Sequence, residues 1–537
     1  MPDMEFRQDD DAPLRMPGGV RRPYLQAGLA GLGLTLVLPP FAWTGLLAPV
    51  PVALLFRALR SAPRPGRTAL VFGLVHQATL LHWLFFLDPA KSIPTRALVP
   101  IQALAAILYV SCFSLVMGWV FGKLRSGPLG RVGPWLLPVL WIGMEALRSR
   151  GELGFSWCLS GSALIGTPLL GLARTSGEIG VGAGIAFLAA LLAVVLPGSG
   201  EGDPRGDRRR VVPMAAMALL WWVWLAAGAL IVRPGPADVG GDGPAELQVA
   251  AIQPDVALVD KWAKDKLDST RVPLAEWTTR AADQGARFIV WPETAVPAYV
   301  RHDNPLLVWT REVVRRSGAH VFTGFPDAER RPDGGITTTN SSGLFSPDGA
   351  LIDQYAKHHL LPIGEAMPFT SLLPFLAKVD VGQAEWTPGP YPRPLAAGPP
   401  LEGFRFSAMI CFESIFSDLA RGPVRDGSAC LVVITNDGWF GRTSGPRQHA
   451  WLARLRAVEC GVPVIRCANN GISFIADAEG RILDWLELGR RGMVAARIIP
   501  GDGGTLYVML GAWPLLGFLA AWLLLGVSRE RAGGGRS

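Results

Sequence analysis

The chain has 537 residues, of which 50% are hydrophobic and 18% are Asp, Glu, Lys or Arg, and its mean hydropathy is +0.29. Because ordinary soluble domains carry about 25% charged residues, this composition excludes a disordered chain and a purely soluble protein. The net charge of +7 comes from arginines in short loops between apolar runs. This pattern is typical of membrane orientation, so no nucleic-acid partner is expected.

Long apolar runs dominate the first 232 residues and return near the end of the chain. A membrane-spanning helix needs about 20 mostly apolar residues. Six runs fit that length: 68–87, 97–121, 132–147, 179–196, 211–232 and 506–527. The uncharged stretch 24–55 is too long for one span, and Pro39 and Pro40 in its middle disfavour a continuous helix. We therefore predict two short helices there and a multi-pass α-helical bundle of eight spans in all.

Arginine and lysine collect in alternate connections between these runs, as do Arg57, Arg60, Arg64 and Arg67 between spans two and three. Since basic residues stay on the cytoplasmic side, both termini are predicted to be cytoplasmic. The predicted layout is a cytoplasmic tail (1–23), seven transmembrane helices (24–232), an extracytoplasmic domain (233–505), an eighth transmembrane helix (506–527) and a second cytoplasmic tail (528–537).

The segment 233–505 has a different character, because charges return and short β-branched runs appear between Pro- and Gly-rich turns. Strands are predicted at 247–252, 287–291, 320–325, 404–411, 431–435 and 463–466. Helices are predicted within 254–282, 305–317 and 445–460, where apolar residues recur at mixed spacings of three and four. This alternation predicts an α/β domain with a buried sheet.

Three residues that can carry chemistry lie at strand ends of this domain: Glu293, Lys357 and Cys411. Taken singly, each has an ordinary alternative, namely a solvated loop carboxylate, a surface lysine and a small core thiol. Taken together they suit acyl transfer, because a thiol of pKa about 8.5 needs a base or a nearby cation to become a nucleophile. Glu293 can take the proton, and Lys357 can stabilise the thiolate and an oxyanion.

The order Glu, Lys, Cys, with the motif WPE (291–293) before and CFE (411–413) after, resembles the nitrilase superfamily. More specifically, the chain is similar to the apolipoprotein N-acyltransferase family, the membrane-bound branch of that superfamily. The similarity extends over nearly the whole length through six further motifs: EALR (145–148), GFSW (154–157), TNDGWFG (435–441), GPRQH (445–449), ARLR (453–456) and NNG (469–471).

The resemblance implies a nitrilase-like α-β-β-α sandwich on the outer side of a bacterial inner membrane. It implies a ping-pong reaction in which a phospholipid donates an acyl chain to Cys411 and the α-amine of a diacylglyceryl-cysteine apolipoprotein then takes it. By motif, Cys411 is the nucleophile, Glu293 the general base and acid, and Lys357 the cation on the oxyanion side. Glu365 and Glu413 match supporting carboxylates.

The same resemblance assigns Trp262 and Trp439 to handling of the lipid substrate. Phe412 stands where many members of the family are expected to carry Tyr, so a hydroxyl role there is absent or replaced. No cofactor and no metal are expected, since the adjacent His358 and His359 lack ligand spacing.

Several alternatives stay open. The same three residues suit a membrane-anchored carbon-nitrogen hydrolase with water as the acceptor, and the outer domain could be a silent envelope scaffold. The apolar, Pro-broken segment 366–376 is either a lipid-touching lid or a loop packed on the core. Cys460 and Cys467 are either core thiols, which we favour, or a disulfide.

Overall fold

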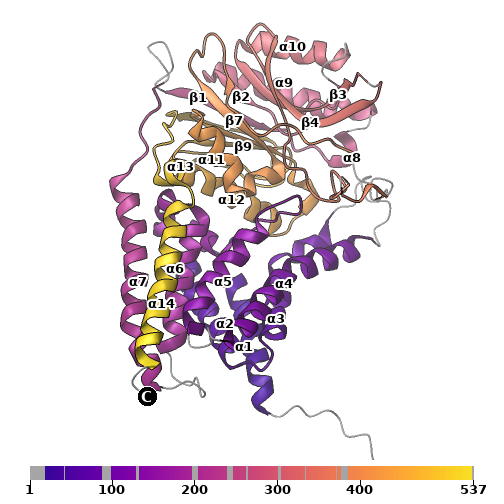
Figure 1. The fold of residues 1–537 in the computed structure, drawn as a ribbon. Coiled ribbons are helices and arrows are strands. Elements are labelled where there is room, and N and C mark those ends of the chain that lie inside the picture. Colours follow the sequence, from indigo (N-terminus) through magenta and orange to yellow (C-terminus); the bar gives the residue numbers. More distant parts are fainter. Residues whose placement is uncertain are drawn as a thin grey trace, which may run out of the picture.

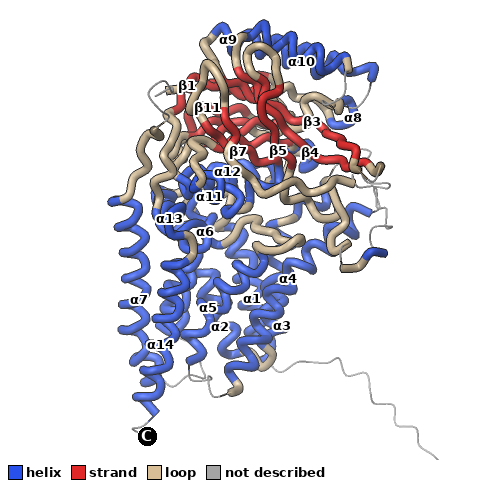
Figure 2. Tube along the Cα trace, turned by 45° about the horizontal axis from the view of Figure 1, so that its top comes forward, coloured by secondary structure: helices blue, strands red, loops and turns tan. Residues whose placement is uncertain are grey.

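The computed structural model describes residues 18–41, 43–87, 98–127, 132–195, 204–238, 246–261, 264–299, 304–332, 334–370, 372–375 and 385–534. These residues form a helical bundle with a sandwich of two sheets stacked on one end (Figures 1 and 2). The bundle contains α1 (Gly18–Leu36), α2 (Pro49–Ser61), α3 (Pro65–Leu80), α4 (Leu98–Arg125), α5 (Gly133–Arg148), α6 (Ala173–Val195), α7 (Pro204–Ile231) and α14 (Trp513–Gly534).

Short 3-10 helices lie in the connections of the bundle that face the sandwich. They are η1 (Thr44–Leu47), η2 (His82–Phe86), η4 (Ser160–Gly166) and η5 (Pro168–Leu172). The stretch 24–55 is divided at Pro39 and Pro40, as predicted, into α1 and α2. The stretch 506–527 is divided as well, into α13 (Leu506–Leu510) and α14, by Gly511 with φ of 57°. A Cβ at Gly511 would meet the Arg421 guanidinium at 2.9 Å, and the positive φ of this position favours glycine.

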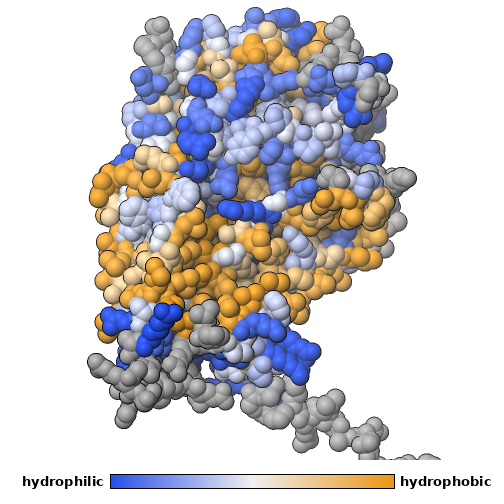
Figure 3. Space-filling model, in the orientation of Figure 1, coloured by the Kyte–Doolittle hydropathy of each residue, from blue (hydrophilic) through white to orange (hydrophobic). Residues whose placement is uncertain are grey.

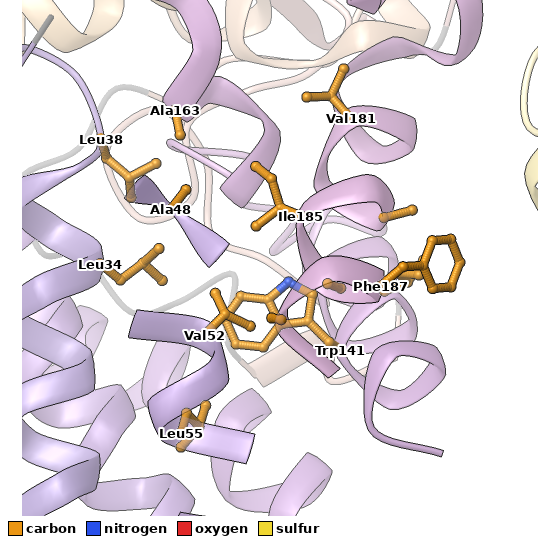
Figure 4. Close-up of a cluster of buried hydrophobic side chains, with 14 of the residues drawn as sticks. Leu34, Leu38, Ala48, Val52, Leu55, Trp141, Ala163, Val181, Ile185 and Phe187 are labelled. Atoms are coloured by element: carbon orange, nitrogen blue, oxygen red, sulfur yellow. The ribbon is translucent and has the colours of Figure 1, made fainter. Parts of the chain in front are cut away.

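On the face seen in Figure 3, an apolar band crosses the bundle between two polar zones. Leu25, Leu104, Leu219 and Leu524 are among its exposed side chains. Within the described ranges, three segments are long and apolar enough to cross a membrane, Leu98–Arg125, Pro168–Val195 and Arg209–Ile231. The interior of the bundle is also apolar, with Trp141, Ile185 and Phe187 among the side chains of its core (Figure 4). Apolar surface on both sides of the helices is the signature of a membrane bundle.

The sandwich consists of two sheets of six strands. The first has the order β12-β1-β2-β3-β4-β5, with bounds β1 (Leu247–Gln253), β2 (Phe288–Val290), β3 (His320–Arg330), β4 (Ile336–Phe345), β5 (Leu351–Ala356) and β12 (Gly492–Ile498). The second has the order β11-β10-β9-β8-β7-β6, with bounds β6 (Leu395–Ala396), β7 (Arg405–Ile410), β8 (Leu431–Thr435), β9 (Val464–Ala468), β10 (Ser473–Ala476) and β11 (Ile482–Leu486). In each sheet three central strands are parallel.

Helices cover the outer face of each sheet, which gives an α-β-β-α order of layers (Figure 2). Helices α9 (Leu267–Asp283) and α10 (Pro305–Ser317) pack on the first sheet. Helices α11 (Ser417–Arg425) and α12 (Gly445–Cys460) pack on the second and lie between it and the bundle. The inner faces share one apolar core, and the parallel strands end together at one edge, where reactive groups collect in α/β domains.

Most elements of the sandwich lie at the positions that the sequence predicts. The strand at 431–435 and the helices at 305–317 and 445–460 match β8, α10 and α12. The helix predicted within 254–282 is shorter and divided, because residues 254–257 are irregular and α8 (Leu258–Lys261) and η6 (Lys264–Lys266) precede α9. Cys460 and Cys467 are buried free thiols.

One glutamine joins the bundle to the sandwich. Gln448 of α12 accepts hydrogen bonds at Oε1 from the indole N–H groups of Trp83 (3.1 Å) and Trp157 (2.8 Å). Its Nε2 donates to the carbonyl oxygens of Pro39 (3.2 Å) and Leu80 (3.4 Å). Since the amide is buried and fully bonded, it fixes the helix beneath the second sheet against three connections of the bundle.

Candidate active site

Cys411 occupies a strained turn at the carboxyl end of β7. Its φ is 53°, in the left-handed region that β-strand residues and most side chains avoid, and η8 (Cys411–Ile415) begins at this residue. Such a conformation costs on the order of 1–3 kcal/mol and persists only when its surroundings hold it. Here the Cys411 carbonyl accepts hydrogen bonds from Ser414 Oγ (2.9 Å) and His449 Nε2 (3.0 Å). The turn therefore presents a half-buried thiol in a fixed place.

Two carboxylates and one lysine form a connected chain beside this thiol. Asn340 of β4 donates from Nδ2 to Glu293 Oε1 (2.8 Å) and to Glu365 Oε1 (3.0 Å). The Lys357 ammonium lies 2.6 Å from Glu365 Oε2. The sheet register explains the placement, because Lys357 follows β5 and its backbone N–H donates to the carbonyl of Asn340 in the neighbouring strand (2.8 Å). Glu293 follows β2, separated from its last residue by Trp291 and Pro292.

Electrostatic coupling joins the three predicted catalytic residues. Burial raises the pKa of Glu293, and the like charge of Glu365 adds to this rise. Burial opposes the charge of Lys357, but the anionic groups around it outweigh that effect and raise its pKa. Burial, with a contribution from Glu293, raises the pKa of Cys411 to about 12, although Lys357 acts in the opposite direction. At neutral pH the thiol is therefore protonated, next to a charged lysine and a carboxylate with increased proton affinity.

Glu413 ties the loop that carries the lysine to the turn that carries the thiol. Its Oε1 accepts hydrogen bonds from the Tyr355 hydroxyl (2.6 Å) and from the backbone N–H groups of His358 (2.8 Å) and His359 (3.0 Å). Its Oε2 accepts from the N–H of Ile410 (2.7 Å). A fully buried carboxylate with four donors is a rigid link between Lys357 and Cys411.

A second buried network supports the turn from the bundle side. His449 Nδ1 lies 3.0 Å from Asp437 Oδ1, and Arg466 contacts Asp437 Oδ2 at 2.7 Å. Burial disfavours the Asp437 charge, but Arg466 and His449 outweigh it and hold the pKa of Asp437 well below its usual range. The ionised pair of Asp437 and Arg466 thus fixes the imidazole that bonds the Cys411 carbonyl.

The apolar residues that follow Cys411 in this turn pack in the core of the bundle. Phe412, Ile415 and Phe416, which follow the thiol in η8 and just after it, are buried in the same apolar cluster as the bundle helices. The ring of Phe412 lies 6.0 Å from that of Phe155 and 5.4 Å from that of Phe416. Position 412 is thus an apolar packing position, and the hydroxyl that bonds Glu413 comes from Tyr355.

The structure brings together Glu293, Lys357, Glu365, Cys411 and Glu413, the five predicted catalytic and supporting residues. Trp262 lies outside the described residues. Trp439 is half-buried in η9 (Asp437–Phe440), next to Phe440, which packs against the rings of Trp83 and Trp157.

Sequence reasoning missed Asn340, which joins the two carboxylates, and gave no role to His449 and Asp437. Asn340 had no signal, because it lies in a polar run of β4 that carries no motif. The motifs GPRQH and TNDGWFG contained His449 and Asp437, and a buried histidine in a motif close to the nucleophile was the signal available.

Comparisons with known proteins agree with this arrangement. Residues 30–191 match the apolipoprotein N-acyltransferase N-terminal domain, and residues 248–505 match the carbon-nitrogen hydrolase family. The apolipoprotein N-acyltransferase of Photobacterium profundum is 31% identical over 506 residues, which cover 92% of each chain. That of Geobacter metallireducens is 30% identical over 543 residues, covering 98% of this chain and 99% of the relative.

Among solved structures, an amidase from Nesterenkonia sp. is similar at a TM-score of 0.36 and 18% identity, covering 50% of this chain and 95% of that one. The family matches extend over both parts of the molecule, the bundle and the sandwich, and the relatives match over nearly their full length. The resemblance predicted from the motifs is confirmed. The chain belongs to the apolipoprotein N-acyltransferase family.

Proposed function

We propose that this enzyme transfers a fatty acyl chain from a phospholipid to the N-terminal α-amine of diacylglyceryl-cysteine apolipoproteins, through a thioester on Cys411. The observation that carries the proposal is the position of the thiol. The charges of Glu293 and Lys357 act on the Cys411 thiol, and the turn that begins at Cys411 continues into Phe412, Ile415 and Phe416 of the bundle core. A soluble amide substrate needs no such contact with an apolar bundle, whereas a lipid does.

In the first half-reaction the Cys411 sulfur attacks the ester carbonyl of the donor lipid, and its proton passes to Glu293. With the pKa of the thiol at about 12, a free thiolate is scarce, so proton transfer and attack are coupled. The Lys357 ammonium faces the charge that develops on the carbonyl oxygen. The tetrahedral adduct breaks its bond to the glycerol oxygen, which takes the proton back from Glu293 and leaves as lysophospholipid.

In the second half-reaction the α-amine of the apolipoprotein attacks the thioester carbonyl. Glu293, again ionised, removes one amine proton as the carbon–nitrogen bond forms. The carbon–sulfur bond then breaks, and the leaving thiolate, stabilised by Lys357, is protonated by Glu293. Atoms and charges balance over the cycle, so no metal or redox partner is required.

The membrane arrangement we propose has eight spans, formed by α1 to α7 and α14, with both termini in the cytoplasm. Helix α1 begins and α14 ends at the face opposite the sandwich (Figure 1). Basic residues of this face are ordered, since the Arg125 guanidinium donates to the carbonyls of Leu59, Arg60 and Ala62 at 2.8–3.1 Å. The positive-inside rule supports a cytoplasmic location for this face, and in the proposed arrangement the sandwich lies on the outer side of the bacterial inner membrane.

We assign lipid contact to Trp262, Trp439 and the segment 366–376. Residues 366–370 and 372–375 of this segment are described, and its tip is apolar and open, with Leu372 75% and Phe375 62% exposed. The N–H of Phe369 donates to Glu152 Oε2 (2.7 Å), which joins the segment to the turn after α5. An exposed apolar tip next to the outer end of the bundle suits contact with acyl chains.

The function is tested with a phospholipid that carries a labelled acyl chain. Membranes with the intact protein should gain label that hydroxylamine releases from Cys411, and an added diacylglyceryl peptide should take it up as a stable amide. The variant Cys411→Ser should show no releasable label at normal expression, whereas Cys112→Ser, which changes a half-buried thiol of α4, should behave as wild type.

Two results would contradict the proposal. Release of ammonia from a small amide without lipid label would favour the hydrolase alternative. Full maturation of lipoproteins by Cys411→Ser would favour a non-catalytic scaffold.

A further inference from the structure

A second lysine lies next to the general base and has no role in the reaction described above. Lys261, the last residue of α8, is 2% exposed, and its Nζ donates to the backbone carbonyl of Glu293 at 2.6 Å. Among the described residues, no carboxylate oxygen lies within 4.0 Å of this ammonium. Because a buried cation is costly unless a partner compensates it, its presence at this point requires a reason.

The charges around Glu293 give that reason. Lys357 forms its close ion pair with Glu365 rather than with Glu293, and the Glu293 carboxylate receives the neutral amide of Asn340. Glu365 carries a like charge that disfavours ionisation of Glu293. The site therefore holds two carboxylates that share one amide. Lys357 pairs with Glu365 and also acts on Glu293, and Lys261 supplies a second positive charge.

We propose that Lys261 is a positioning residue for the acyl transfer put forward above. Its ammonium holds the Glu293 backbone, which keeps the Glu293 carboxylate near the Cys411 thiol. Its positive charge favours the ionised form of Glu293. The inference rests on the proposed function for the identity of the base, and on the hydrogen bond between Lys261 and the Glu293 carbonyl for the contact.

The groups that face the pair come from several elements. Those that act on Glu293 are Lys357 after β5, Glu365 in the following loop, Asn340 in β4 and Lys261 in α8. Those that act on Lys261 are Glu293 and Cys467 of β9. The Cys467 thiol donates to the carbonyls of Ile252 (3.2 Å) and Val290 (3.3 Å), and burial raises its pKa, so it stays neutral.

Burial lowers the pKa of Lys261 to about 8, against the pull of Glu293. Burial raises the pKa of Glu293, and the charge of Lys357 and, to a smaller extent, that of Lys261 oppose this rise. If Lys261 loses its charge, the proton affinity of Glu293 increases further, and a higher pH is needed to form the base.

The test is the pH dependence of thioester formation in the purified full chain with labelled phospholipid. Lys261→Met should form the thioester at least about tenfold more slowly at pH 7, and the acid limb of its rate profile should move up by about 0.5–1 pH unit. Lys261→Arg should restore the wild-type limb. Lys261→Gln, which keeps a donor without the charge, should recover part of the rate but keep the shifted limb.

The matched control is Lys266→Met. Lys266 is a neighbouring surface lysine, 52% exposed, that pairs with Asp260 of α8, the short helix that ends at Lys261. Its loss should leave the acid limb in place, which separates a loosened α8 from a lost buried charge. Should Lys261→Met fail to fold, as a melting curve in detergent reveals, Lys261→Gln carries the test of the charge.

A Lys261→Met or Lys261→Gln profile with an unmoved acid limb would overturn the inference, and so would a Lys261→Arg profile shifted as far as the others. If the wild-type chain formed no lipid thioester, the proposed function would fail, but the role of Lys261 would still be decided. In that case the same shift is sought in the pH dependence of Cys411 alkylation by iodoacetamide.

Discussion

Two buried ionic networks of this molecule are alike in composition and differ in arrangement. At the junction of bundle and sandwich, Arg456 of α12 lies between two carboxylates, 2.8 Å from Glu178 Oε2 and 3.1 Å from Glu459 Oε2. At the active site, two carboxylates again accompany one nearby cation, but Lys357 contacts only Glu365, and Glu293 receives an amide. Burial raises the pKa of both Glu459 and Glu293.

The difference lies in what each carboxylate is free to do. The planar guanidinium of Arg456 lies within ion-pair distance of both acids and also donates to the carbonyl of Ile415 (3.3 Å), so one cation serves both carboxylates. Lys357 pairs with Glu365 instead, and among the described residues Glu293 has no ion pair within 4.0 Å, next to a thiol in a strained turn. Burial and raised proton affinity therefore do not mark a catalytic acid by themselves. The position of the cation, on one carboxylate or between two, separates a proton carrier from a structural bridge.

The largest effect is expected from removing the acid that lacks an ion pair. Glu293→Gln keeps a similar shape but cannot take a proton, so thioester formation should fall by about 10²- to 10⁴-fold. The melting temperature should change little, because the amide can still bond to the Asn340 side chain. Rapid-quench measurement of labelled Cys411 checks this. An equal loss of activity in folded Glu459→Gln would remove the distinction between the two networks.

The next effect is expected at the junction. Arg456→Met leaves Glu178 and Glu459 buried without their cation, which should destabilise the protein by about 3–5 kcal/mol. The reason is desolvation without compensation, so the loss should appear in thermal unfolding monitored in detergent. The surface variant Arg481→Met, which breaks an exposed ion pair with Asp477, is the control and should cost less than about 1 kcal/mol. A stable but inactive Arg456→Met would show that this network takes part in the chemistry.

The smallest effect is expected from the neutral link between bundle and sandwich. Gln448→Leu removes the acceptor of two buried indole N–H groups and should cost about 1–3 kcal/mol. Since His449 follows Gln448 directly and bonds the Cys411 carbonyl, the rate of thioester formation should fall severalfold at unchanged affinity for the lipid. The rate and the half-saturating lipid concentration are compared with those of Gln448→Glu. That variant keeps the acceptor, so it should retain more of the rate than Gln448→Leu. Full stability of Gln448→Leu would contradict the assignment of this link.

Much of the fold follows from periodicity alone. The strands that precede Glu293 and Cys411 and the helix at 445–460 could be predicted because they are apolar with clear spacing and ends. Strands β4 and β5 could not, since polar residues such as Thr338 and Asn340 of β4 break the apolar pattern that marks a buried strand. The break at Gly511 was missed because an apolar run continues on both sides of it, and a single glycine in such a run does not by itself predict a turn.

The site residues that stand in motifs could be predicted from the sequence. Glu293, Lys357 and Cys411 stand in recognisable surroundings, but their connection through Asn340 depends on the register of β4 against β5. The hydrogen bond of Lys261 to the Glu293 carbonyl joins residues that are 32 positions apart. Because the partner is a backbone oxygen, no side-chain pattern in the sequence predicts this contact.

The shared core of the thiol turn and the bundle has a practical consequence for anyone who wishes to dissect this enzyme. A truncated product cut out at residues 246–505 would keep every catalytic side chain, yet Phe412, Ile415 and Phe416 would lose the helices that now cover them. Such a fragment should aggregate, or bind detergent through this surface, and its cysteine should sit in a relaxed turn. Inhibitor screens and crystallisation trials are therefore best carried out on the whole chain, because the turn that carries Cys411 packs on the helices of the bundle.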